Sequence, residues 1–521
     1  MSRALLKSTS VVGGFTLLSR VLGLVRDVVL STYIPVGKGM DAFLVAFKIP
    51  NFMRRMFGEG AFSQAFVPVV GEYRKTREHQ EVQALVDRVA GTFGGMLLLI
   101  NALGIIAAPL LVLMFAPGFL DNNGQFLLTT ELLRITFPYL FFIALTAFAG
   151  GILNTYGHFA GPALAPVLLN VLLIAAAIWG GTHFEVPVMP LAWAVLLAGI
   201  AQLLLQLPFL ARIKLVPRPR WDRHHPGVRR VFRLMLPALF GSSVAQVNLL
   251  VDTLIASFLA VGSVTWLYFG DRLMEFPLGV FAIALGTVIL PKLSEQHAAR
   301  DPEQFRQTLD FALRLAFLVG VPAAVGLFVL AQPIIATLFF HVPDLADKTH
   351  NVIMTSWALM AYSLGLLGFT LVKILAPGYF ARQDTRTPVR VGFVAVGVNV
   401  ALNIAIVYWL VREGFAAPHA GLALATGVAA FVNAGLLYRG LRKHGHFTPL
   451  AGWWLFLGRV LAAAALMGGL VAYLAGGLDG WLAGNLWERA FRLLGIVAAG
   501  GISYVLVLLA SGLRPRHFKG L

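Results

Sequence analysis

The chain has 521 residues, of which 58% are hydrophobic and only 12% charged, and its formal net charge at pH 7 is +17. This composition excludes an ordinary soluble domain. The apolar runs are continuous and about twenty residues long, which indicates membrane helices rather than the short alternating strands of a membrane barrel. No block of lysine and arginine is interleaved with aromatic residues, so nucleic acid is not an expected partner. The absence of cysteine excludes disulfides and thiol chemistry.

The N-terminus has a basic start followed by an apolar run, as a signal peptide does. However, Arg20 and Arg26 interrupt this run, and no A-x-A-like cleavage site closes it. We therefore expect an uncleaved first helix.

Hydrophobic runs predict an all-α polytopic membrane protein with fourteen transmembrane helices. In chain order, the predicted helices cover residues 10–34, 39–72, 84–115, 129–154, 161–181, 188–211, 229–260, 265–296, 304–340, 350–379, 387–411, 418–440, 452–476 and 486–511. We expect the second to break at Pro50 and the tail of the ninth to form a separate piece.

The connections between these helices fall into two sets that differ in charge. One set is rich in arginine and lysine: Arg74, Lys75, Arg77, Arg212, Lys214, Arg218, Arg220, Arg223, Lys292, Arg300, Arg382, Arg386, Arg442, Lys443, Arg514, Arg516 and Lys519. The opposite set offers only Lys38, Lys348 and Arg412. The positive-inside rule then predicts that both termini are cytoplasmic, which an even number of spans requires.

A weak internal repeat divides the chain. Pro291 follows Pro68 by 223 residues (291 − 68), and Pro388 follows Pro162 by 226 (388 − 162), with similar neighbouring residues in the first pair. Parallel six-helix repeats are a known transporter plan. We therefore expect an N-terminal six-helix lobe, a cytoplasmic linker, a C-terminal six-helix lobe, and two extra helices with a basic cytoplasmic tail: residues 1–213, 214–228, 229–445 and 446–521.

Charged residues accumulate in the first two predicted spans, where each costs roughly 2.5–3.5 kcal/mol on insertion scales. Arg20 and Asp27 nearly share a helix face, and Arg26 lies about 120° away from them. Such charges indicate a polar cavity, and the excess of cations predicts an anionic guest. The alternative is that Arg20 or Arg26 reaches a membrane interface and only anchors the helix.

The second span carries one stripe of charged residues at helical spacing: Asp41, Lys48, Arg55 and Glu59. Arg54 points away from this stripe unless the break at Pro50 reorients the lower half. Asn51 can satisfy or present polar groups beside the break. Pairing of Lys48 with Asp41, or of Arg55 with Glu59, is the structural alternative to a role in the cavity.

The eighth span repeats this pattern, since Asp271, Arg272 and Glu275 lie just before a proline. Arg272 lines a cavity there or pairs with Glu275 at i+3. Lys373 is a further intramembrane cation, and we expect it at a helix break before Ala376-Pro377-Gly378.

A separate polar group joins one carboxylate to neutral oxygens: Asp252, Asn399, Asn403 and Thr426. Such oxygens suit a hard cation such as Na⁺, or a proton if the Asp252 carboxyl is protonated. An interhelical hydrogen-bond network with protonated Asp252 is the alternative. No other metal or cofactor is expected, because no H-E-x-x-H spacing is present. No P-loop or nucleophile elbow exists either, so we expect a transporter rather than an enzyme.

Several long motifs resemble those of the bacterial lipid II flippases, the MurJ (MviN) family of the multidrug/oligosaccharidyl-lipid/polysaccharide exporter superfamily. They are Ser19-Arg-Val-Leu-Gly-Leu-Val-Arg-Asp27, Asp41-Ala-Phe-Leu-Val-Ala-Phe-Lys-Ile-Pro-Asn51, the run Arg54 to Pro68, Asp271-Arg-Leu-Met-Glu-Phe-Pro277 and the run Leu375 to Pro388. The resemblance extends over essentially the whole chain.

The resemblance implies a flippase that carries undecaprenyl-diphosphate-linked peptidoglycan precursor (lipid II) to the outer leaflet of the bacterial cytoplasmic (inner) membrane by alternating access. It implies diphosphate binding by Arg20, Arg26, Arg54 and Arg272. It also implies cavity or gate roles for Asp41, Asn51, Glu59 and Glu275. The charge pattern of the sequence adds four further candidates for such roles: Asp27, Arg55, Asp271 and Lys373. The two extra helices are expected to form a groove for the lipid tail. Some relatives bind Na⁺ in the C-terminal lobe, and other cell-wall synthesis proteins are candidate partners.

Three other classes of protein are alternatives. An exporter of another lipid-linked oligosaccharide, or of a drug or metabolite, would share the fold, but an acidic cavity for cationic drugs conflicts with the arginines. A glycosyl- or phosphotransferase would need a carboxylate cluster at a membrane face, which the sequence lacks. A scaffold for cell-wall enzymes would tolerate loss of every intramembrane charge.

Overall fold

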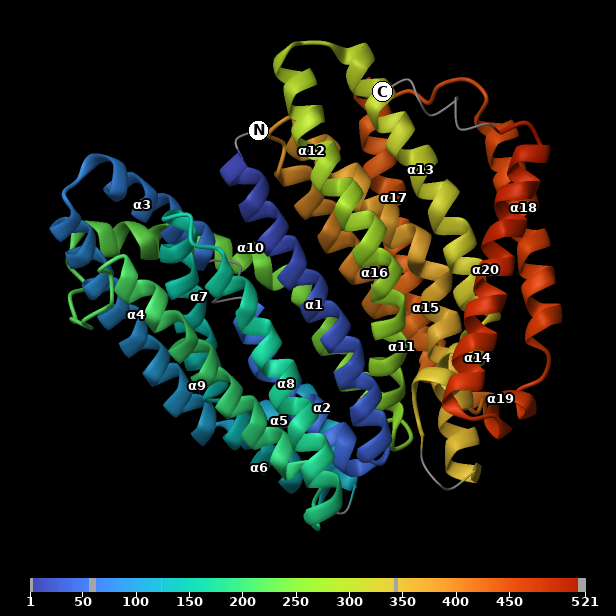
Figure 1. Cartoon of the computed structure of the whole chain (residues 1–521), viewed down its shortest axis with the longest axis horizontal. Helices are drawn as coiled ribbons and strands as arrows, with labels where there is room; N and C mark the ends of the chain where they lie inside the picture. Colours follow the sequence, from blue (N-terminus) through green and yellow to red (C-terminus); the bar gives the residue numbers. More distant parts are fainter. Residues whose placement is uncertain (1–2, 56–61, 123, 342–344, 514–521) are drawn as a thin grey trace. The chain divides into compact units, whose positions relative to one another are not determined.

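The computed structural model describes residues 3–55, 62–122, 124–341 and 345–513, and these residues form helices and connections without strands (Figure 1). The chain divides into two compact units, Met1–Thr265 and Trp266–Leu521. Ten helices in the described residues are long and apolar enough to cross a membrane. The chain is therefore an all-helical polytopic membrane protein.

In its described residues, the first unit contains ten α-helices and one short 3₁₀ turn. In chain order they are α1 (Arg3–Tyr33), α2 (Lys38–Arg54), α3 (Ser63–Thr76), α4 (His79–Ile106), α5 (Ala108–Phe115), η2 (Pro117–Asp121), α6 (Gln125–Thr136), α7 (Tyr139–Thr155), α8 (Ala160–His183), α9 (Met189–Arg212) and α10 (Pro226–Ser257). Helix α11 (Ser263–Pro277) begins at the end of this unit.

The second unit continues α11, and the part of it that the structure describes adds nine α-helices and one π-helical turn. These are η3 (Leu278–Ala282), α12 (Ile283–Ala298), α13 (Pro302–Val329), α14 (Ala331–Leu338), α15 (Leu345–Phe380), α16 (Arg386–Arg412), α17 (Ala420–Lys443), α18 (Trp453–Ala475), α19 (Asp479–Ala483) and α20 (Leu486–Ala510). The separate α14 confirms the predicted end piece of the ninth span.

Local sequence explains where several helices begin. Proline occupies the first turn of α10 and α13, where its missing N–H costs nothing. The side chain of Asp301 accepts a hydrogen bond from the amide of Gln304 at the start of α13. Asn485 and Glu488 form a complete capping box at the start of α20.

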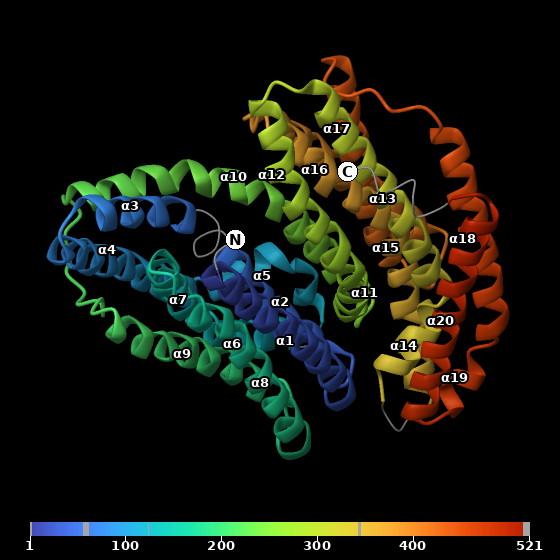
Figure 2. The same ribbon diagram turned by 45° about the horizontal axis from the view of Figure 1, so that its top comes forward.

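The core of the first unit is built on stacked phenylalanines from α4, α7 and the segment leading into α3. The rings of Phe62 and Phe93 lie 4.0 Å apart, and those of Phe66 and Phe148 lie 4.8 Å apart. All four side chains are almost fully buried. Helix α10 packs along α3 beside this core, as Figure 2 shows. Thus α10, which the repeat assigns to the C-terminal lobe, lies in the first compact unit.

The second unit is organised around the close contact of α15 with α17. A Cβ atom on Gly365 would lie 2.4 Å from the Cα of Gly427, so only glycine permits this approach of the two backbones. Helix α13 packs on α15, and α18 packs on both α13 and α20. The two helices beyond the predicted repeat are therefore attached to this unit through α13 and α14.

In each unit, an aspartate on one helix accepts a hydrogen bond from the backbone of a connection further along the chain. The helix is α4 in the first unit and α13 in the second. In the first unit, Oδ1 of Asp87 on α4 accepts the amide of Arg218 at 2.8 Å. In the second, Oδ1 of Asp310 on α13 accepts the amide of Leu450 at 2.9 Å. Asp310 follows Asp87 by 223 residues (310 − 87), which is the spacing of the proline pair at 68 and 291. Two similar hydrogen bonds thus occur at the spacing of the weak sequence repeat.

The expected break at Pro50 is wrong, because α2 continues through this proline to Arg54. Pro50 leaves the carbonyl of Ala46 without its helical donor. The hydroxyl of Thr136 donates to that carbonyl at 3.0 Å and so replaces the missing bond.

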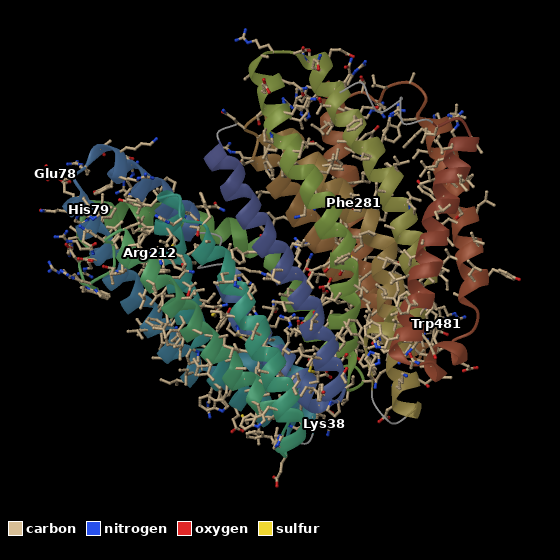
Figure 3. All side chains as sticks on the ribbon, viewed as in Figure 1. Lys38, Glu78, His79, Arg212, Phe281 and Trp481 are labelled. Atoms are coloured by element: carbon tan, nitrogen blue, oxygen red, sulfur yellow. The ribbon has the colours of Figure 1, made fainter. Side chains whose placement is uncertain are left out.

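The two sets of loops lie at opposite ends of the first unit. Figure 3 shows Lys38 at one end, and Glu78, His79 and Arg212 at the other. This separation agrees with the alternation of poorly and strongly basic loops that the sequence predicts.

Candidate functional site

Arg26 and Asp27 form a buried pair in α1 of the first unit. Nε and Nη2 of Arg26 both donate to Oδ1 of Asp27, at 2.9 and 2.7 Å. Nη1 of Arg26 donates to Oδ1 of Asn170 on α8 at 3.0 Å. The side chains of Arg26 and Asp27 are only 9% and 4% exposed. Arg26 is therefore held deep between α1 and α8, which argues against interfacial anchoring.

Arg20 lies on the same helix but is exposed in the first unit. The carbonyl of the preceding residue, Ser19, accepts the amide of Asn170 at 3.1 Å. Asn170 therefore contacts α1 both beside Arg20 and at Arg26, and it fixes the stretch of helix that carries the two arginines.

Asp41 caps the beginning of α11. Its Oδ2 accepts the amide of Gly262 at 2.7 Å, and its Oδ1 accepts both the amide and the hydroxyl of Thr265, at 2.9 and 2.6 Å. A carboxylate at a helix N-terminus satisfies otherwise unpaired amides and is favoured by the helix dipole. Asp41 thus ties α2 to the first turn of α11, just before the chain enters its second unit.

Lys48, two turns after Asp41, faces the neighbouring helix α10. Its Nζ donates to the hydroxyl of Thr253 at 2.9 Å. Asp41 and Lys48, the first two residues of the predicted stripe, therefore both face the segment that contains α10 and the start of α11. Arg55 ends the described part of this stripe and is exposed, whereas Glu59 lies outside the described residues.

Arg54 and Asn51 meet on the last turn of α2. Nε of Arg54 donates to Oδ1 of Asn51 at 3.2 Å, and Nδ2 of Asn51 donates to the carbonyl of Phe47 at 3.0 Å. Asn51 thus satisfies its own helix and orients the half-buried arginine.

Arg272 in the second unit pairs with Glu275, as the i+3 alternative predicts. Nη1 of Arg272 lies 2.9 Å from Oε2 of Glu275, and the two side chains are 35% and 46% exposed. The guanidinium carbon also lies 5.0 Å from the ring centre of Tyr268. The neighbouring Asp271 is half-buried. This partly open arginine remains accessible to a ligand.

Lys373 is exposed on α15, but the helix break expected beside it is wrong. Helix α15 continues through Pro377 and ends only at Phe380. The loop after it is ordered by Asp384, whose carboxylate accepts the hydroxyl and the amide of Thr387 at 2.6 and 3.0 Å. These two hydrogen bonds lower the pKa of Asp384 below its ordinary value.

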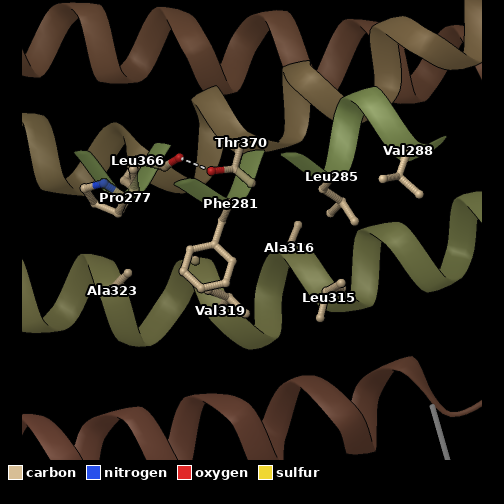
Figure 4. A pocket seen from close by; sticks show the side chains of 11 residues that line it. Pro277, Phe281, Leu285, Val288, Leu315, Ala316, Val319, Ala323, Leu366 and Thr370 are labelled. Atoms are coloured by element: carbon tan, nitrogen blue, oxygen red, sulfur yellow. Dashed lines mark hydrogen bonds between the residues drawn. The ribbon is translucent and has the colours of Figure 1, made fainter. Parts of the chain in front are cut away.

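An apolar cavity of about 350 Å³ lies beside the π-helical turn η3, within the second unit (Figure 4). It is lined by Pro277 and Phe281 from the bend, by Leu315 and Val319 from α13, and by Thr370 from α15, among others. The Thr370 hydroxyl donates to the carbonyl of Leu366. Such walls suit hydrocarbon and exclude a charged head group.

Three of the four residues predicted for a cation meet in the second unit. Nδ2 of Asn403 donates to Oδ1 of Asn399 at 3.2 Å, and Nδ2 of Asn399 donates to the hydroxyl of Thr426 at 3.1 Å. Both asparagines are fully buried. Asp252 is half-buried on α10, in the first unit. The oxygens of Asn399, Asn403 and Thr426 suit either Na⁺ binding or an interhelical hydrogen-bond network. Na⁺ binding would also need the carboxylate of Asp252.

Sequence reasoning missed Asn170, Thr253 and Thr265, which hold the predicted charges in place. Asn170 carries a usable signal, because it is a lone amide within the apolar run Pro166-Val-Leu-Leu-Asn-Val-Leu-Leu173. The two threonines carry none, since buried threonine hydroxyls commonly bond within their own helix.

The fold and the buried polar groups define a membrane transporter. A multidrug-resistance transporter of the MATE family in an inward-facing conformation has the same fold, with a TM-score of 0.64 and 15% identity over 82% of this chain and 95% of that one. A structure described as lipid II flippase MurJ in an inward closed conformation matches with a TM-score of 0.77 and 27% identity, covering 95% and 97% of the two chains.

The family model for lipid II flippase MurJ matches residues 30–492. The MurJ relative of Vibrio cholerae serotype O1 is 44% identical over all of this chain and 98% of its own length. The lipid II flippase MurJ of Burkholderia cenocepacia is 43% identical over 90% of each chain. The chain belongs to the lipid II flippase MurJ family, a family of transporters rather than enzymes.

Proposed function

We propose that this chain moves lipid II, the undecaprenyl-diphosphate-linked peptidoglycan precursor, from the inner to the outer leaflet of the bacterial cytoplasmic membrane. Membership of the MurJ family over the full length of the chain carries this proposal. The arginines of α1, α2 and α11 are the side chains that suit its diphosphate, because a guanidinium binds phosphate oxygens in a bidentate fashion.

The arginines have different tasks in this proposal. Arg26 shares its charge with Asp27, so it can bind diphosphate only by exchanging one acceptor for another. Arg20 and Arg272 are more exposed and make the first contact. Arg54 is oriented toward its site by Asn51. This set of cations replaces the hydration of the head group while the polyprenyl tail stays in hydrocarbon.

The proposed membrane arrangement has fourteen spans and two cytoplasmic termini. It comprises two six-helix lobes that rock about the head group in alternating access, with α18 and α20 forming a groove for the tail. Exposed apolar side chains on both helices support that groove, among them Leu461, Leu466, Leu494 and Ile502.

A depletion experiment tests the function. Cells depleted of their own lipid II flippase are supplied with this chain, and the lipid II accessible at the outer leaflet is measured. Restored accessibility and growth are expected from the wild type and from Arg412→Gln, which alters an exposed cation at the end of α16. Arg26→Ala should restore neither while still inserting in the membrane. Failure of the wild type to restore outer-leaflet lipid II refutes the proposal.

The alternative substrate is another lipid-linked oligosaccharide. The same cells distinguish it, because such an exporter would leave lipid II in the inner leaflet while moving its own substrate. A scaffold role is distinguished by Arg26→Ala, since a scaffold needs no buried arginine.

A further inference from the structure

Four basic side chains, none of them among the arginines discussed above, meet at one end of the second unit. His341 follows α14, Lys348 lies in the first turn of α15, and Arg489 and Arg492 lie in the first two turns of α20. Among the residues that the structure describes, none of the four forms an ion pair with a carboxylate. This basic cluster is therefore rich in charge without a counter-charge.

The two central cations are buried. Arg489 is 6% exposed and Lys348 is 7% exposed. Arg489 donates to the carbonyls of Ala336 and Asn485, and Nζ of Lys348 donates to the carbonyl of Leu482 at 3.3 Å. Carbonyl dipoles compensate a buried positive charge only in part, and two like charges close together raise the cost. An anion bound between them would remove that cost.

His341 lies beside Arg489 and adds an imidazole to the cluster. Its Nδ1 lies 3.5 Å from Nη2 of Arg489, and the backbone carbonyls of Leu338 and Thr337 also lie within hydrogen-bonding reach of the ring. Nε2 is buried and has no hydrogen-bond partner in the described part of the chain. Burial and the charges of Arg489 and Lys348 also lower the pKa of His341. His341 therefore adds a ring nitrogen, Nε2, that the described residues leave unused.

Arg492 provides a fixed cation at the exposed rim of the cluster. Its guanidinium lies 4.4 Å from the ring centre of Trp481, and Nη2 donates to the carbonyl of Ala475 at 2.8 Å. Trp481 is fully buried near this end of the unit (Figure 3). The stacking holds the guanidinium flat, with donors left for a ligand. Among the described carboxylates near the cluster in sequence, Asp347 is exposed, and Glu488 accepts the amide of Asn485 in the capping box.

We propose that this cluster binds a phosphate group, with Lys348 and Arg489 inside, His341 beside them and Arg492 at the entrance. The ammonium of Lys348 and the guanidinium of Arg489 present donors in different geometries, which suits the tetrahedral oxygens of phosphate better than a planar carboxylate. The cluster lies at the ends of the membrane-spanning helices α15 and α20, on the face predicted to be extracytoplasmic. The phosphate is supplied by a phospholipid head group or by free phosphate. The proposal does not depend on the transported substrate.

The melting temperature of the full-length protein in neutral detergent tests the site. Phosphatidylglycerol is compared with diacylglycerol of the same tails, which lacks the phosphate, and with inorganic phosphate. A rise of a few degrees with phosphatidylglycerol and none with diacylglycerol is expected. An equal rise with inorganic phosphate alone supports the site and assigns free phosphate as its ligand. Equal rises with both lipids, or no rise with either phosphate compound, overturn the proposal.

Matched variants locate the effect. Lys348→Gln and Arg492→Gln should lose most of the phosphate-dependent rise, whereas Arg412→Gln, an exposed cation on the same predicted face, should keep it. Arg489 also holds α14 in place, so the test relies on Lys348 and on the rim residue. A full phosphate-dependent rise in both Lys348→Gln and Arg492→Gln refutes the assignment.

Discussion

The hydroxyl of Thr265 donates a 2.6 Å hydrogen bond to Oδ1 of Asp41, although 224 residues separate the two in the chain. The same carboxylate accepts the amides of Gly262 and Thr265. The carboxylate of Asp41 therefore holds the first turn of α11 against α2. Any motion that separates these helices must break all three bonds together.

Asp41→Asn should lower both stability and transport. An amide offers one oxygen where the carboxylate offers two, and its NH₂ group would face backbone donors. Each lost bond to a charged acceptor is worth about 1.5–3 kcal/mol. We expect a clear fall in melting temperature and loss of complementation. Thr265→Val keeps the two amide bonds and should show a smaller fall. Equal melting of Asp41→Asn and wild type would contradict the capping role.

We expect the guanidinium of Arg26 to be required for transport and not only for stability. Arg26→Lys keeps the charge but replaces three nitrogens, which bind Asp27 and Asn170 in a planar fork, with a single nitrogen, so we expect growth well below wild type in a complementation assay. Asp27→Ala leaves a buried arginine without its carboxylate and should destabilise by about 3–5 kcal/mol. Asn170→Leu should have a milder effect. Normal growth of Arg26→Lys would show that charge alone suffices.

The sequence could predict the helices and the charged side chains, but not their partners. Hydrophobic runs located several long helices, such as α8, α9 and α17, to within three residues at each end, because apolar length is a property of the sequence itself. The helix break predicted at Pro50 was wrong because the hydroxyl of Thr136, which lies far along the chain, replaces the hydrogen bond that the proline removes. Asp41 and Arg26 were chosen for their charge, whereas Thr265 and Asn170 were missed because only the folded chain brings them near. The pairing of Arg272 with Glu275 was predictable, since both lie on one turn.

Arg272→Ala separates binding from folding. The Arg272–Glu275 pair is partly exposed, at 35% and 46%, so its loss should cost less than about 1 kcal/mol. We therefore expect a nearly unchanged melting temperature together with failure to complement. Glu275→Gln frees the arginine and is the matched control, which should keep more activity than Arg272→Ala. A large loss of stability in Arg272→Ala would instead indicate a structural role.

Sodium distinguishes the two interpretations of Asn399, Asn403 and Thr426. If Asp252 completes a cation site, NaCl should raise the melting temperature above that in KCl at equal ionic strength, and Asp252→Asn should abolish the difference. If the hydrogen bonds between the asparagines and Thr426 are the whole function of the group, the two salts should act alike. Asn399→Leu should then destabilise equally in both salts, because it breaks the same network.

Acid sensitivity of the loop after α15 follows from Asp384. Hydrogen bonds from the hydroxyl and amide of Thr387 lower its pKa, so the folded state favours the carboxylate. The resulting stabilisation is complete above the ordinary aspartate pKa and is lost as pH falls through the lowered one. Thr387→Val removes the hydroxyl bond and should reduce the melting temperature at pH 7. This deficit should shrink as the pH falls below about 4, where wild type loses the same interaction. In a protein that carries Asp384→Asn, the change in melting temperature caused by Thr387→Val should no longer depend on pH. If the loss of melting temperature in Thr387→Val alone stays constant as the pH falls below about 4, packing rather than the hydrogen bond explains it.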